Sequence, residues 1–220
     1  MRLALLSCLS VVLAASAGAA SKPHIVSLGK PVPAKLVVGP GETQTLDIGI
    51  GPLYVDGKVK EFTTGNMHDV TDREFVVRRA YRINDTLPDD AHKTPKWLWQ
   101  RGGWILVNRV SGKVSVMKLP DFDAFYSDVS WYRDYAAYCG ISNSGERVIA
   151  VVAEVGSNKP LYHKDVGKNS GSEVSDSNCS APHWARQPAR VTFLPKSGES
   201  FTVNVSGHFA DEVEHDSDEQ

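Results

Sequence analysis

Apolar and polar residues alternate along much of this chain, a pattern that places one face of a strand in a core. Between 45 and 50, Leu46, Ile48 and Ile50 alternate with polar or small residues, which predicts a half-buried strand. A second stretch at 75–83 interleaves arginines with apolar side chains. Helix-spaced apolar positions are scarce beyond the first twenty residues, so we expect strands to dominate.

Four pairs of β-rich segments are each separated by a short turn that contains glycine, which is typical of β-hairpins. The clearest spans Tyr54–Val59, because Asp56-Gly57 tolerates the positive φ of a type I′ turn. The other three span residues 104–119, 132–155 and 190–205. Serial hairpins predict an all-β, mostly antiparallel fold. Two arrangements stay open: a two-layer sandwich, or meander sheets stacked like part of a propeller.

The first 20 residues have the layout of a secretory signal peptide. Arg2 precedes an apolar run from Leu3 to Ala15, and the small residues at 15–19 fit a signal-peptidase site. The run is shorter than the roughly 20 apolar residues that span a membrane. We therefore expect a secreted or periplasmic chain with no transmembrane segment after cleavage. A lipoprotein anchored at Cys8 is the less favoured alternative, since the apolar run continues past it.

Beyond the leader, we expect one β-rich domain over residues 21–208, followed by an acidic tail over 209–220. About 200 residues are enough for one domain with a sizeable core. Runs of like charge usually stay solvated, so the tail is predicted to be disordered. Its acidic residues are Asp211, Glu212, Glu214, Asp216, Asp218 and Glu219.

Composition excludes several classes of function. The formal net charge is −2, and both signs are mixed along the body of the chain. The basic stripe that nucleic-acid binding requires is missing, so we expect no nucleic-acid partner. The sequence contains no nucleophile elbow, H-E-x-x-H helix or phosphate-binding glycine loop. We therefore assign no catalytic residue and expect neither a metal nor a cofactor.

Cys139 and Cys179 remain once the leader is removed, and an even pair in an exported chain predicts a disulfide. The bond would join a strand to the end of segment 164–180, whose Ser, Gly and Asn content predicts a surface loop. Closing a loop of about 40 residues stabilises the fold by roughly 4 kcal/mol. The two Cα atoms should lie about 4.4–6.8 Å apart.

Aromatic residues give the best indication of function. Trp97 and Trp99 are two positions apart, so on a strand they share a face, about 7 Å from each other. Such rings stack on sugars and on protein side chains, although aromatic residues also fill β cores. The sequence predicts a non-enzymatic binding domain that recognises an envelope glycan or another exported protein. Its candidate contact residues are Trp97, Trp99, Arg101, Trp104, Trp131 and Arg133.

Aspartates support the alternative function, hydrolysis of an envelope saccharide or peptide. Glycoside hydrolysis requires paired carboxylates, which Asp121, Asp123, Asp128 and Asp134 could supply. The first three also offer oxygen ligands for calcium, although their spacing departs from the EF-hand pattern. A third possibility, a subunit of an envelope assembly, predicts a large exposed apolar patch instead.

Three segments of the chain resemble an uncharacterised group of exported bacterial β-rich proteins: Leu53–Thr63, Trp99–Trp104 and Ser130–Tyr135. The resemblance covers most of the mature chain and implies export from a bacterial cell. The group has no known activity, so the resemblance implies no role for any residue.

Overall fold

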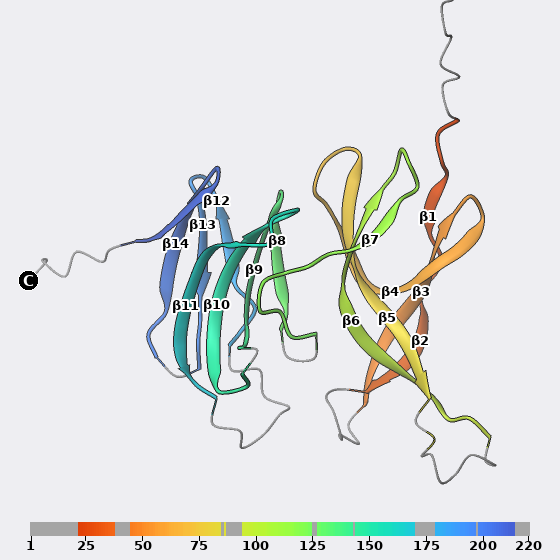
Figure 1. Ribbon diagram of the computed structural model, residues 1–220, viewed down its shortest axis with the longest axis horizontal. Helices are drawn as coiled ribbons and strands as arrows, with labels where there is room; N and C mark the ends of the chain where they lie inside the picture. The colour runs from red at the N-terminus through yellow and green to blue at the C-terminus, as the bar shows by residue number, and fades with distance from the viewer. Residues whose placement is uncertain are drawn as a thin grey trace, which may run out of the picture.

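The computed structural model describes residues 22–37, 45–84, 86, 94–124, 127–142, 144–169, 179–196 and 198–213. These residues form fifteen strands, almost all of them paired antiparallel, so the predicted all-β class is confirmed (Figure 1). Over the same ranges, no helix is long and apolar enough to cross a membrane. The predicted signal peptide lies outside the described residues.

The N-terminal half is a curled sheet around its own core. Strands β2 to β6 pair in chain order, and β6 also pairs with β2, in parallel, so the sheet closes on itself. Inside lie Leu53, Phe75, Val77, Ile105 and Val107. The strands are β1 (Val26–Leu28), β2 (Val32–Val37), β3 (Thr45–Val55), β4 (Lys58–Asp69), β5 (Glu74–Asn84), β6 (Trp97–Asn108) and β7 (Val114–Val116).

All four predicted hairpins are present. They are β3–β4, β6–β7, β9 (Tyr135–Ile141) with β10 (Arg147–Glu154), and β13 (Ala189–Phe193) with β14 (Phe201–Ser206). In the first, Val55 lies opposite Lys58, and Asp56 and Gly57 have φ of 53° and 74°. Positive φ at both central residues is the signature of the type I′ turn that Asp-Gly predicts.

The C-terminal half is a two-layer sandwich. One sheet contains β8 (Val129–Tyr132), β9 (Tyr135–Ile141), β10 (Arg147–Glu154) and β11 (Pro160–Lys168). The other contains β12 (His183–Arg186), β13 (Ala189–Phe193), β14 (Phe201–Ser206) and β15 (Phe209–Glu212). Their shared core includes Ala150, Val152, Val191, Phe193 and Val203. Of the two arrangements that the hairpin pattern allowed, this half therefore adopts the two-layer sandwich.

Strands β9 and β10 are buried on both faces. Their second face carries Tyr138, Ile149 and Val151, against which Phe122 and Trp131 pack. This explains why both strands are continuous apolar runs, since neither face meets water. The sheet of β8–β11 therefore packs against β12–β15 on one side, while its other side faces the N-terminal half (Figure 1).

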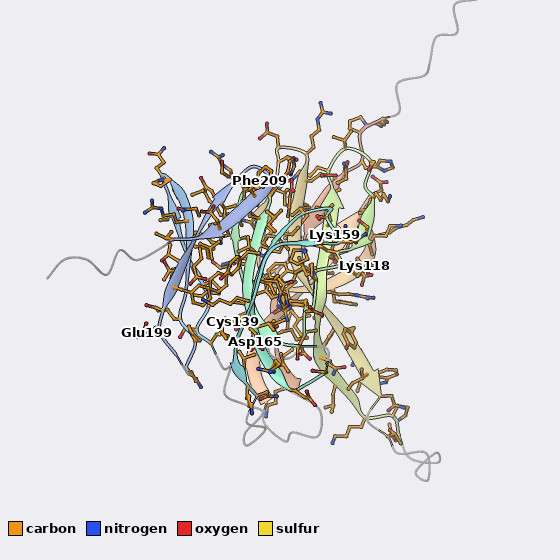
Figure 2. All side chains as sticks on the ribbon, turned by 60° about the vertical axis from the view of Figure 1, so that its left-hand side comes forward. Lys118, Cys139, Lys159, Asp165, Glu199 and Phe209 are labelled. Atoms are coloured by element: carbon orange, nitrogen blue, oxygen red, sulfur yellow. A yellow bond between two sulfur atoms is a disulfide. The ribbon has the colours of Figure 1, made fainter. Side chains whose placement is uncertain are left out.

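The disulfide prediction is confirmed. Cys139 in β9 is bonded to Cys179, with 5.8 Å between their Cα atoms, and both lie in the core of the sandwich (Figure 2). The loop predicted over 164–180 starts too early, because residues 164–168 belong to β11. Pairing with β11 satisfies the main-chain groups along the second edge of β10, and buried main-chain groups need such partners. Residues 170–178 lie outside the described residues.

The predicted start of the disordered tail is wrong. Residues 209–212 form β15, which pairs with β14. The Glu212 carboxylate accepts hydrogen bonds from Lys164 Nζ at 2.7 Å and Tyr162 Oη at 2.8 Å. The bond from Lys164 holds the pKa of Glu212 below its ordinary value. The negative charge of Glu212 is therefore balanced by the positive charge of Lys164. The remaining tail, 214–220, lies outside the described residues.

Candidate binding surface

One outer face of the N-terminal sheet combines aromatic rings with arginines. Residues directly opposite each other in an antiparallel pair point to the same face. Phe62 of β4 lies opposite Ala80 of β5, which lies opposite Arg101 of β6. Two positions further along, Arg82 lies opposite Trp99, and Asn84 lies opposite Trp97. We call this surface, which faces away from the core of the N-terminal half, the aromatic–arginine face.

A β-bulge at Gly102 and Gly103 extends the same face along β6. Ala80 lies opposite Arg101, whereas Arg78 lies opposite Trp104, so β6 gains one residue between these pairs. The bulge restores Trp104 to the face of Trp99 and Arg101. A side chain at Gly102 would be crowded, because its Cβ would lie 3.2 Å from Arg79 Cβ and from Tyr81 Cδ1.

The end of this face beyond the bulge is open to solvent, and we call its four residues, Phe62, Arg82, Trp97 and Trp99, the exposed patch. Trp97 is 52% exposed and Phe62 is 39% exposed. The rings of Phe62 and Trp99 meet edge to face at 5.1 Å. The Arg82 guanidinium lies 5.7 Å from the centroid of Trp97 and 5.4 Å from that of Trp99. The patch therefore presents a cation between two indoles.

Arg82 differs from its neighbours in its charge balance. Arg79 Nε is 2.9 Å from Glu61 Oε2, and Arg101 Nη1 is 2.9 Å from Asp128 Oδ1. Among the described residues, no carboxylate forms such a pair with Arg82, which is itself exposed. The exposed patch thus holds a positive charge that its described surroundings do not neutralise.

The other end of the face is covered by the C-terminal half. Trp104 is only 8% exposed, and its ring meets that of Trp131 edge to face at 5.0 Å. Trp131 in turn stacks on His68 at 5.8 Å, and His68 Nε2 lies 2.8 Å from the carbonyl oxygen of Arg133. Trp104 and Trp131 therefore fill the joint between the two halves, as the core interpretation of the aromatic residues predicts.

Arg78 connects the two halves at this joint, a role that was not predicted from the sequence. Its guanidinium donates to the carbonyl oxygens of Gly102 at 2.8 Å, Ala124 at 2.6 Å and Ser127 at 3.1 Å. It also lies 5.0 Å from the ring centroid of Phe122. Burial lowers the pKa of Arg78 to about 9, so it is still charged at neutral pH. The available signal was the pair of arginines, Arg78 and Arg79, within the apolar run at 75–80.

The structure therefore separates the six predicted contact residues. Trp97 and Trp99 lie in the exposed patch, and Arg101 lies at its border. Trp104 and Trp131 lie in the joint between the halves. Arg133 has a φ of 52° in the β8–β9 turn, where its guanidinium lies 5.4 Å from the centroid of Tyr132.

The four candidate aspartates lie in or beside the joint. Asp121 Oδ2 is 3.3 Å from His163 Nε2, and Asp128 is bonded to Arg101. The carbonyl oxygen of Asp123 accepts the Ser127 N–H, and that of Asp134 accepts the Val155 N–H. In the part of the chain that the structure describes, no group of three or more His, Cys, Asp or Glu could hold a metal ion.

Comparison of the chain with protein-family models, with curated proteins and with solved structures found no match. The functional argument therefore rests on the contacts of this chain's own residues.

Proposed function

We propose that this protein is an exported, non-enzymatic binding protein that contacts an envelope glycan or another exported protein through the exposed patch. The observation that carries the proposal is the cluster of Trp97, Trp99, Phe62 and Arg82 at the uncovered end of one sheet face.

The geometry suits recognition for physical reasons. Indole and phenyl rings contribute large apolar contacts at a small entropic cost, and they stack on sugars and on side chains. Tryptophan and arginine dominate the energetics of protein interfaces. Trp97 is exposed where Trp104, on the same face, is buried. Binding a ligand would therefore remove an exposed apolar surface from water.

Secretion or residence in the periplasm is part of the proposal. A disulfide between Cys139 and Cys179 is stable in oxidising compartments and rare in reducing ones. The leader predicted over residues 1–20 supports the same location.

Hydrolysis by paired aspartates stays an alternative prediction, and we do not adopt it. Asp121 and Asp128 are engaged by cationic or potentially cationic side chains, His163 and Arg101 respectively. In the binding function, by contrast, Arg82 and the rings around it are available to a ligand.

Glycan and peptide arrays probed with the full chain test the proposal. We expect at least one class of glycan or peptide on the arrays to bind the wild type and not to bind the Trp97→Ala variant. Phe209→Ala is the matched control, because Phe209 is an aromatic side chain, 79% exposed, on β15 in the other half. Arrays that stay blank, or binding that Phe209→Ala removes and Trp97→Ala leaves intact, would contradict the proposal.

A further inference from the structure

We infer that the exposed patch binds an acidic segment of a partner protein that also carries aromatic side chains. The inference rests on the proposed binding function and specifies its ligand. Its basis is the covered end of the same face, where a segment of this chemistry from the chain itself is already bound.

The covering segment, whose described residues are 120–124 and 127–131, contacts the face through three kinds of group. Its carboxylate at Asp128 pairs with Arg101. Its carbonyl oxygens at Ala124 and Ser127 accept hydrogen bonds from Arg78. Its aromatic rings pack on the arginine–tryptophan pair, Phe122 against Arg78 and Trp131 against Trp104.

The composition of this segment matches the surface it covers. The sequence of residues 120–131 contains three aspartates and four aromatic residues, namely Asp121, Asp123, Asp128, Phe122, Phe125, Tyr126 and Trp131. Among the described residues of this segment, the side chains of Asp128, Phe122 and Trp131 contact the face. Carboxylates suit guanidinium groups, which they bind in a planar fork, and aromatic rings suit indoles. The segment therefore shows which chemistry the aromatic–arginine face accepts.

The exposed patch repeats this arrangement without an occupant from the described residues. In both places an arginine of the face lies beside a tryptophan of the face: Arg82 is 5.4 Å from the ring centroid of Trp99, and Arg78 is 5.6 Å from that of Trp104. The two ends belong to one continuous face, with Arg101 between them. A carboxylate placed on Arg82 would neutralise its charge, while an aromatic side chain would contact the indoles. A neutral sugar would use the rings and leave the cation unpaired.

The test uses a labelled peptide with the sequence of residues 119–132, with binding to the full chain followed by fluorescence anisotropy. A first twin carries D121N, D123N and D128N, and a second replaces the four aromatic residues by alanine. The protein variants are Arg82→Gln and Trp97→Ala, with Phe209→Ala as control. Far-UV circular dichroism and the thermal midpoint establish that each variant is folded.

We expect the wild type to bind the acidic peptide at least about tenfold more tightly than either twin, a difference typical of interface hot spots. Arg82→Gln should abolish the preference over the neutral twin. Trp97→Ala should weaken binding at least about tenfold, and Phe209→Ala should leave it unchanged. Equal affinity for the acidic peptide and its neutral twin, or an Arg82→Gln variant with unchanged preference, would overturn the inference.

Two further results separate this inference from the proposed function. If only saccharides bind, and Trp97→Ala abolishes that binding, the peptide inference fails and the binding function stands. If neither peptides nor saccharides bind in a Trp97-dependent way, both fail. Sedimentation of the unliganded chain tests whether a second copy occupies the exposed patch. A dimer that Arg82→Gln dissociates would identify a second copy as the occupant and would also overturn the inference.

Discussion

Removing the disulfide should destabilise the protein by an amount that the structure allows us to calculate. The bond joins residues 40 positions apart, so the chain-entropy relation assigns about 4 kcal/mol to its effect on the unfolded chain. Cys139 and Cys179 are both 7% exposed, and their replacement by alanine removes two buried sulfur atoms, worth about 1 kcal/mol more. The loss of about 5 kcal/mol is a large part of a typical free energy of unfolding.

Urea unfolding, followed by tryptophan fluorescence, separates these two contributions. Wild type in reductant should lose about 4 kcal/mol, the part that comes from loop closure. The double variant Cys139→Ala, Cys179→Ala should lose about 1 kcal/mol more, with a thermal midpoint about 10–20 °C below that of the oxidised wild type. A loss below about 1 kcal/mol on reduction would refute the reasoning, because the unfolded chain would then gain no freedom from opening the loop.

Four other substitutions test the joint and the sandwich. Arg78→Met leaves three carbonyl oxygens without their donor and should lower the free energy of unfolding by about 2–4 kcal/mol in urea titrations. Gly140→Ala places a Cβ 2.5 Å from Ser127 Oγ and should cost about 1–3 kcal/mol by the same assay. Ser127→Ala should be near neutral alone, because its buried hydroxyl has no hydrogen-bond partner among the described residues. Combined with Gly140→Ala it should restore much of that loss, because it removes the Oγ that the new Cβ meets. Glu212→Gln should cost about 0.5–1 kcal/mol at pH 7. Since the pKa of Glu212 is lowered in the folded state, unfolding titrations should show this difference above pH 4.5 and its loss as the pH falls through the lowered pKa.

The local elements of the fold were predictable because their causes are local. The Asp56-Gly57 turn follows from two residues that tolerate positive φ, and both adopt it. The alternation of Trp97 and Trp99 placed them on one face, as the register confirms. The disulfide followed from an isolated cysteine pair in a chain whose sequence predicts a leader.

Contacts between distant segments were not predictable in this way. The parallel pairing of β2 with β6, which closes the N-terminal sheet, leaves no local trace in either strand. The bulge at Gly102 and Gly103 was likewise hidden, although it decides that Trp104 shares the face of Trp99. Which end of that face the C-terminal half covers depends on long-range packing. The sequence therefore grouped Trp97 and Trp104 as one surface, whereas one is exposed and the other buried.

The central claim, that the exposed patch contacts the ligand, is tested most directly by the indole N–H signals of the five tryptophans in a 15N-labelled chain. The ligand selected on the arrays is titrated to saturation while the five signals are followed. We predict that the signals of Trp97 and Trp99 shift, whereas those of Trp104 and Trp131 stay in place. The signal of Trp184 in β12, whose Nε1 donates to the carbonyl oxygen of Ser130, should also stay in place. Saturable binding with shifts confined to Trp104, Trp131 or Trp184 would contradict the claim.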